Sequence, residues 1–208
     1  FITIRGLSHK PMSFEERPFP DFNLKDSAVF NFCSGQLIYQ KLSKEEKEFY
    51  YWVNYSSNNP KKFFDSVVVP IVQIYPQLKG NYLTSLGVDL KGLNHLPLLS
   101  LNESLEKMAK DHSEDITSHN SPASHNSTSG ETFSDRFKKY VFRKCGGENI
   151  SYGANNTIFL LTLLYLDIDL PTLGHRKALL NANFTETGIG NSFYQNGLIF
   201  LVEDFACP

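Results

Sequence analysis

Two histidines and three acids in the second half of the chain are the residues best suited to chemistry. His125 lies in a polar loop, and Glu148 lies in a Gly-Glu-Asn-Ile run. His175 follows in a Gly-His-Arg run, with Asp167 and Asp169 shortly before it. Neutral imidazoles and a carboxylate that face one cavity are ligands for a divalent cation such as zinc. We therefore expect a metal site at His125 and His175, with Glu148, Asp167 and Asp169 as the site acids.

The same residues also have a structural interpretation. Glu148 would cap backbone amides or helices, and both histidines would hydrogen-bond to it and hold the layers of the fold together. For Glu148 we favour this interpretation. For the histidine pair, metal binding and a structural role are equally supported.

A metal-assisted hydrolase, similar to a peptidase, is the alternative function for this site. A metal-bound water or a histidine base would attack the substrate with help from Glu148. The sequence contains no His-Glu-x-x-His and no Gly-x-Ser-x-Gly motif, and Ser124 is only the chain neighbour of His125. We therefore expect a protein that is not an enzyme.

The elements that must position these residues are helices first and strands last. Ser43 and Ser100 each precede a glutamate by three residues, which is the pattern of a capping box that begins a helix. One helix should stop at Pro70, and Asn196-Gly197 predicts a hairpin between two final strands. We expect further helices at about 61–69, 82–90, 132–140, 156–166 and 174–181, and strands at 148–152, 186–194 and 198–205. This order predicts an α+β fold.

Apolar residues recur at helical spacing in the helix that follows Ser100. Leu105, Met108 and Ile116 lie on one face, and His112 lies among them. We interpret His112 as a hydrogen-bonded core histidine.

Composition excludes several function classes. The 208 residues fit one domain with an extension, or two small domains. The net charge of −2 and the lack of a Lys/Arg-rich block argue against nucleic acid as a partner. The longest apolar run, 158–166, is far shorter than the roughly 20 residues of a membrane span. Because the chain begins at Phe1, we expect that a signal peptide or another leading segment has been removed.

Cysteines and glycosylation sequons favour a secreted protein. Cys33, Cys145 and Cys207 allow three single disulfides, and we expect Cys207 to take part because a bridge would tie down the terminal strand. Cys33 could instead pin the N-terminal segment. In a secreted eukaryotic protein, some of the Asn-x-Ser/Thr sequons would carry glycans on surface loops. Alternatively, a composition rich in Asn and Ser produces sequons by chance, as at Asn149, which we expect to be buried. The six sequons begin at Asn54, Asn102, Asn126, Asn149, Asn155 and Asn183.

Several motifs, in order, resemble the CAP superfamily, which contains cysteine-rich secretory proteins, antigen 5, plant pathogenesis-related proteins and bacterial relatives. They are Asn54 in Trp-Val-Asn-Tyr; Leu96-Pro97-Leu98 with Leu105, Ala109, His112 and Asp115; Ser124-His125 with Gly130 and Asp135-Arg136; Gly147-Glu148-Asn149-Ile150; and Gly174-His175-Arg176 with Leu179-Leu180-Asn181, Phe184 and Gly188-Ile189-Gly190. His119 is the rival of His125, because both lie in Ser-His-Asn-Ser. The spacing to Gly130 and Asp135-Arg136 decides for His125.

The resemblance implies an SCP-like domain at 43–208, with residues 1–42 as an extended arm wrapped on the core. The implied fold is a three-layer α-β-α sandwich with a small antiparallel sheet. The animal-type site has a second acid on the helix before the last histidine, but here that helix is apolar. Asp167 or Asp169 would replace this acid, or it is absent. This difference makes the chain a bacterial-like or protist-like variant.

The function implied is that of a secreted module that binds a sterol, another lipid or a protein partner. A third possibility, neither an enzyme nor a carrier, is a structural component of a larger extracellular or organellar assembly. The aromatic N-terminal arm would suit such a component.

Overall fold

The computed structural model describes residues 2–4, 12–15, 17–141 and 145–208. A four-stranded sheet of order β3-β5-β6-β4 lies in its middle. β4 and β5 both pair antiparallel with β6, whereas the short β3 runs parallel to β5. We predicted an antiparallel sheet, but one of its strand pairs is parallel. The strands are β3 Ser100–Leu101, β4 Gly146–Tyr152, β5 Glu186–Phe193 and β6 Ile199–Ala206.

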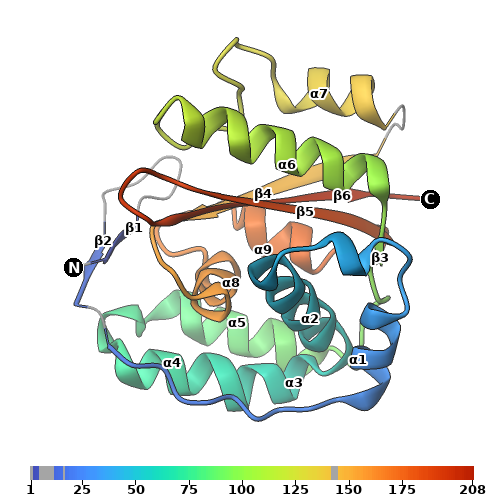
Figure 1. Ribbon diagram of the computed structural model, residues 1–208. Helices are drawn as coiled ribbons and strands as arrows, with labels where there is room; N and C mark the ends of the chain where they lie inside the picture. Colours follow the sequence, from blue (N-terminus) through green and yellow to red (C-terminus); the bar gives the residue numbers. More distant parts are fainter. Residues whose placement is uncertain (1, 5–11, 16, 142–144) are drawn as a thin grey trace.

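Helices cover both faces of the sheet (Figure 1). α6 and α7 lie on one face, and α2, α8 and α9 lie on the other, with α3, α4 and α5 behind them. This arrangement confirms the predicted α+β class. The helices are α1 Ser27–Ser34, α2 Lys44–Asn58, α3 Pro60–Phe63, α4 Val69–Ile74, α5 Asn81–Gly92, α6 Glu103–Ser118, α7 Phe133–Tyr140, α8 Thr157–Leu166 and α9 Gly174–Leu179. Short turns of other helical types are η1 Tyr39–Lys41, η2 Phe64–Val68 and η3 Pro76–Leu78, and β1 Ile2–Ile4 pairs with β2 Met12–Phe14.

The two expected capping boxes have different outcomes. Ser43 and Glu46 cap α2 reciprocally, as predicted. The box expected at Ser100 is wrong, because Ser100 lies in β3 and its N–H donates to the carbonyl of Thr185. Asn102 caps α6 instead, and its side-chain oxygen accepts from two backbone amides of the first turn. The strand pairing of Ser100 therefore moves the helix start by two residues.

The prediction that a helix stops at Pro70 is also wrong. The helical path continues from α3 through the π-helical turn η2 into α4, which contains Pro70. A proline lacks an N–H and clashes with the carbonyl four residues earlier in an α-helix. A π-turn rearranges that hydrogen-bond ladder, so the chain passes the proline without ending the helix.

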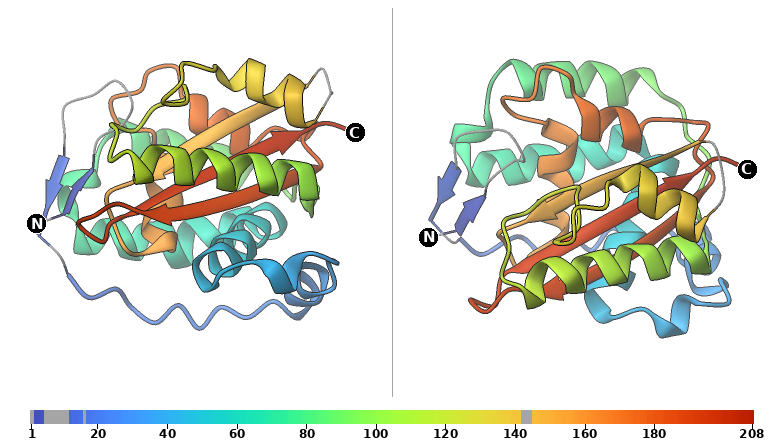
Figure 2. Two further views of the ribbon diagram at one scale, coloured as in Figure 1. Left: turned by 45° about the horizontal axis from the view of Figure 1, so that its top comes forward. Right: turned by 90° about the horizontal axis from the view of Figure 1, so that it is seen from above.

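Two glycines of β5 let α6 lie directly on the sheet (Figure 2). A Cβ at Gly188 would lie 2.1 Å from backbone atoms of Leu105 and Glu106. A Cβ at Gly190 would lie 2.3 Å from the backbone nitrogen of Lys110. The Gly-Ile-Gly run is therefore a packing feature. It places α6, and the loop after it, close to the strands.

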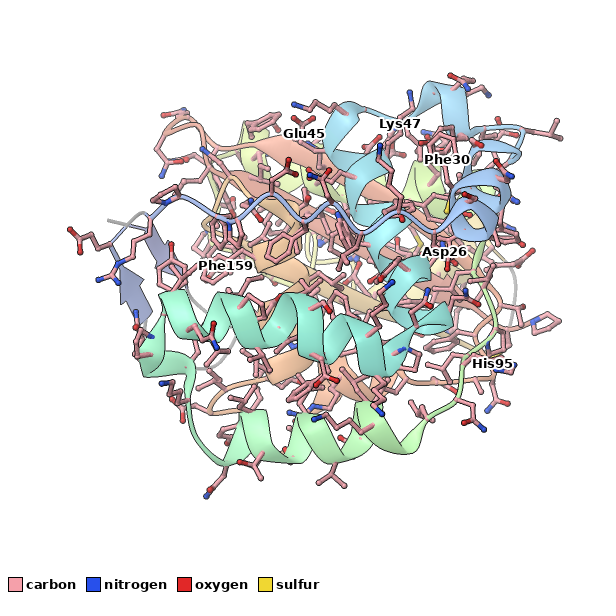
Figure 3. All side chains as sticks on the ribbon, turned by 90° about the horizontal axis from the view of Figure 1, so that it is seen from below. Asp26, Phe30, Glu45, Lys47, His95 and Phe159 are labelled. Carbon is pink, nitrogen blue, oxygen red and sulfur yellow. A yellow bond between two sulfur atoms is a disulfide. The ribbon has the colours of Figure 1, made fainter. Side chains whose placement is uncertain are left out.

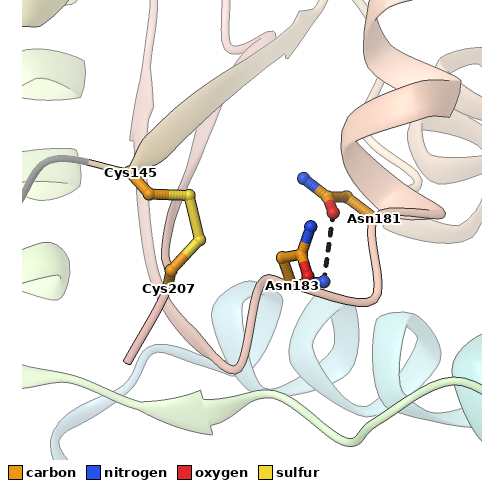
Figure 4. Close-up of a disulfide and its surroundings, with 4 residues drawn as sticks. All are labelled: Cys145, Asn181, Asn183 and Cys207. Carbon is orange, nitrogen blue, oxygen red and sulfur yellow. Dashed lines mark hydrogen bonds between the residues drawn. A yellow bond between two sulfur atoms is a disulfide. The ribbon is translucent and has the colours of Figure 1, made fainter.

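A disulfide joins Cys145 to Cys207, so the ends of β4 and β6 are tied together (Figure 4). The expected participation of Cys207 is confirmed. The expectation that Cys33 pins the N-terminal segment is wrong, because Cys33 is a free, buried thiol in α1. Burial raises its pKa to about 12, so it behaves as an inert core residue.

The described part of the N-terminal arm lies along the helices beneath the sheet (Figure 1). The Arg17 side chain donates to the carbonyl of Ile74, and the Phe19 ring packs against those of Tyr75 and Phe159. The boundary predicted at residues 42 and 43 stays a prediction, and part of the arm lies outside the described residues.

Candidate functional site

His125, Glu148 and Arg136 form a hydrogen-bonded cluster on the α6 side of the sheet. Glu148 comes from β4 and is buried; one of its oxygens lies 2.7 Å from Nδ1 of His125, and the other accepts from the Arg136 guanidinium. Arg136 also donates to the carbonyl of His125 at 2.7 Å. Burial alone would raise the pKa of Glu148, but the His125 hydrogen bond and the Arg136 charge outweigh it and lower that pKa. Glu148 is therefore an ionised carboxylate that holds the half-exposed imidazole.

Two side chains of α6 shape the loop that carries His125. His112 is buried, and its Nε2 lies 2.9 Å from the carbonyl of Ser124. Asp115 accepts from the N–H of Thr128 at 2.7 Å and from its hydroxyl. These contacts hold the loop at both ends of the His125 segment. The expected hydrogen-bonded core role of His112 is confirmed, and His125, not its rival His119, contacts Glu148.

His175 and Asp167 form a second pair in the helical layer across the sheet. Nδ1 of His175 lies 2.6 Å from one oxygen of Asp167, and the other oxygen accepts from the N–H of Arg176. Asp167 is buried just after α8 and adopts a left-handed backbone conformation. Asp169 is exposed. Of the two acids considered, Asp167 is the partner of His175.

The two pairs lie on opposite faces of the sheet. Neighbouring residues of a strand point to opposite faces. Glu148 points with Gly188 toward α6, whereas the amide of Asn149 lies 3.5 Å from the carbonyl of His175 on the other side. Within the described ranges, no group of three or more His, Cys, Asp or Glu side chains is arranged to hold a metal ion. The structure thus gives each histidine its own carboxylate, and the metal site stays a prediction.

Arg136 and Arg176 have roles that the sequence interpretation missed. Arg176 is fully buried, and its guanidinium donates to the carbonyls of Tyr165, Tyr82 and Leu166 and to side chains of α5. It therefore joins α9 to α8 and α5. Arg136 belongs to the Asp-Arg motif and Arg176 to the Gly-His-Arg motif described above. The sequence therefore shows that the arginines are present, but it does not show that they are buried.

Two buried acids on β6 were also missed. Asp204 lies directly opposite Glu148, and Glu203 lies opposite Asn149 on the other face. Burial, and secondarily the Glu148 charge, raises the pKa of Asp204 well above its ordinary value. Burial raises the pKa of Glu203 to about 8, although the Asn149 amide partly offsets this effect. Burial therefore favours the neutral form of both carboxyl groups. The signal in the sequence was an acidic pair inside an apolar terminal strand.

A separate groove of about 560 Å³ lies between the N-terminal segment and α2. Five aromatic side chains line part of its wall, those of Phe22, Phe30, Tyr39, Tyr51 and Trp52. Phe30 is 54% exposed, and it lies near Lys47 in the view from below (Figure 3). The Tyr51 hydroxyl donates to the carbonyl of Leu24 and accepts from an amide N–H of the same segment, so the wall is fixed on α2.

Fold and site together define a three-layer α+β sandwich with a histidine–carboxylate pair on each face of its sheet. The family model described as "Cysteine-rich secretory protein family" (CAP) matches residues 91–205, and the chain belongs to this family. None of the described helices is long and apolar enough to cross a membrane.

Two solved structures are similar to this chain. One is an extracellular protein containing a SCP domain from Bacillus anthracis, with 22% identity over 79% of this chain and a TM-score of 0.47. This chain covers 40% of that protein. The other is an outer surface protein from Borrelia burgdorferi, with 20% identity over 65% of this chain and 90% of that one, and a TM-score of 0.44. No curated protein matches the chain.

Proposed function

We propose that this chain is an extracellular CAP domain that binds an apolar small molecule with one polar end, such as a sterol or a fatty acid. The observation that carries the proposal is the aromatic groove between residues 22–31 and α2. Its volume of about 560 Å³ falls within the range of roughly 300–1,000 Å³ that is typical of small-molecule sites.

The groove is suited to an amphipathic ligand because its apolar wall has a polar rim. Trp52 packs edge-on against Phe22 and Tyr51, with ring centroids 6.2 and 5.4 Å apart. Lys25 and Lys47 lie at the rim and offer ammonium groups to a polar end. Asp26 caps α1 and also accepts hydrogen bonds from two asparagine side chains at the C-terminal end of α2. Its carboxylate therefore already has hydrogen-bond partners. A preformed wall reduces the entropy lost on binding.

Replacing Phe30 tests this proposal. Burying one phenylalanine contributes about 1.5–3 kcal/mol, so Phe30→Ser should weaken binding of a fluorescent sterol or fatty acid about tenfold or more. Phe193→Ser is the matched control, because Phe193 is 51% exposed and lies outside the groove. Native mass spectrometry of the purified protein would identify a carried ligand. Equal binding by both variants would reject the groove, and absence of any ligand together with a stable oligomer would favour the structural alternative.

Zinc binding at the histidines is the second candidate. In each pair the carboxylate engages Nδ1, which leaves Nε2 for a ligand and orients the ring. A carboxylate behind a ligating histidine is the usual arrangement in zinc sites. His125 and His175 would be the ligands, and Glu148 and Asp167 would orient them. When bound, zinc would polarise a ligand oxygen, the chemistry that the hydrolase alternative requires.

Separate variants of the two histidines test whether either of them is a zinc ligand. Zinc titration by calorimetry at pH 7.5 should show at least tenfold weaker binding for His125→Ala or His175→Ala if the histidines are ligands. His119→Ala is the control, because His119 is exposed and contacts Asp115 instead. Unchanged affinity in both variants, or no binding by the wild type, would leave the pairs as internal structure.

A further inference from the structure

We propose that Asn126, Asn155 and Asn183 are the N-glycan acceptors of this chain, and that Asn54 and Asn149 are not. The inference rests on the extracellular route of the proposed function and concerns sites outside the groove. Asn126, Asn155 and Asn183 begin Asn-x-Thr sequons, whereas Asn54, Asn102 and Asn149 begin Asn-x-Ser sequons. The structure separates them by burial and by the hydrogen bonds of each side-chain amide.

Asn54 and Asn149 are part of the core. Asn54 is fully buried in α2; its amide lies near the carbonyls of Tyr50 and Leu99, and its oxygen accepts from the N–H of Leu99 at 2.8 Å. Asn149 is buried against α9, where its amide faces the carbonyl of His175. N-glycans are attached through this amide nitrogen. A glycan at either position would block packing of the chain, so folded, secreted molecules should carry none.

Asn102 is the N-cap residue of α6. Its side-chain oxygen accepts from the first amides of α6, and the residue is half-buried.

Asn126, Asn155 and Asn183 are exposed. Asn126 lies in the loop after α6, and Asn155 lies two residues before α8. Asn183 lies between α9 and β5, near the Cys145–Cys207 disulfide (Figure 4). Each belongs to a connecting segment between elements, and such surface segments accommodate bulky groups. None of the three lines the aromatic groove, although Asn155 lines an adjoining pocket that shares Phe22 and Trp52 with it.

The position of Asn126 has a consequence for the histidine cluster. It follows His125 directly, and its N–H donates to the hydroxyl of Ser124. A glycan there would lie beside the half-exposed imidazole and hinder large partners, while a metal ion would still reach it.

Secretion of the intact chain from yeast or mammalian cells tests the assignment. Enzymatic glycan release in heavy-oxygen water converts each occupied asparagine to a labelled aspartate, which peptide mass spectrometry then locates. We expect label at Asn126, Asn155 and Asn183, and a loss of one glycan mass from each single Asn→Gln variant. Thr185→Ala is the matched control for Asn183, because it removes the sequon and keeps the asparagine.

Label at Asn54 or Asn149 in folded, secreted protein would overturn the proposal. So would unoccupied Asn126, Asn155 and Asn183 in cells that glycosylate a co-expressed reference protein. Ligand binding is measured separately on enzymatically deglycosylated protein, so failure of the glycan assignment is distinguishable from failure of the groove.

Discussion

Glu148 is a buried acid that stays ionised. Glu203, on the neighbouring strand β6, is a buried acid that favours its protonated form. Glu148 has an arginine and a histidine as partners, and together they hold its pKa below the ordinary value despite burial. Glu203 lies on the other face of β6 from Asp204, where the Asn149 amide only partly offsets the effect of its burial. Burial therefore raises the pKa of Glu203 to about 8. The difference comes from the partners, because both side chains are buried.

This raised pKa predicts that stability falls as pH rises. Between the unfolded pKa of about 4.3 and the folded pKa of about 8, the folded chain holds a proton on Glu203 that the unfolded chain has released. The free energy of unfolding should therefore fall by a few kcal/mol from about pH 5 to pH 8. Glu203→Gln should flatten much of this slope, and Asp204 contributes with the same sign. Urea unfolding at several pH values measures the slope, and equal slopes in the two proteins would contradict the assignment.

At the scale of secondary-structure elements, close contact between α6 and β5 positions the loop that carries His125. The helix lies on Gly188 and Gly190, and its residues His112 and Asp115 then hold the loop segment. A methyl group on the strand would push the helix, and with it the loop, away from Glu148. Packing of one helix thus determines the geometry of the cluster.

Gly188→Ala should destabilise the protein by at least about 1–3 kcal/mol, since the new Cβ meets backbone atoms that cannot rotate away. Gly92→Ala at the end of α5 is the control. A Cβ there meets nothing within 4 Å, so the change should be neutral or slightly stabilising. Denaturant unfolding of both variants checks the prediction, and a similar midpoint for both would show that α6 has room to move.

At the scale of the whole molecule, the disulfide joins the end of the chain to the start of β4. The two cysteines are 62 residues apart, and the segment between them contains α8, α9 and β5. β4 is an edge strand that pairs only with β6 within the described sheet. The bridge therefore restrains the unfolded chain and secures one edge of the sheet.

Removing this bridge should lower the free energy of unfolding by about 2–4 kcal/mol. Replacing Cys145 and Cys207 by serine should lower the melting temperature, and reductant should have little further effect on that variant. Cys33→Ala serves as the comparison, because it keeps the bridge and should therefore keep the response of the wild type to reductant. If the double variant, the reduced wild type and the oxidised wild type were all equally stable, the sheet edge would be secured by packing alone.

The sequence by itself determined the features that depend on neighbouring residues. The α2 capping box, the terminal hairpin and the apolar face of α6 are local patterns, and the ordered motifs were enough to indicate the family. The cap of α6 and the helix through Pro70 were predicted wrongly, because strand pairing and a π-turn changed the local preference.

Only the tertiary structure decided how the site is assembled. Glu148 and Asn149 are neighbours in sequence but point to opposite faces of the sheet, so His125 and His175 meet different acids. The burial of Arg136 and Arg176, and the groove between the N-terminal segment and α2, depend on which segments fold against each other. Distances between residues far apart in the chain are set by packing of whole elements, and motif spacing carries no measure of them.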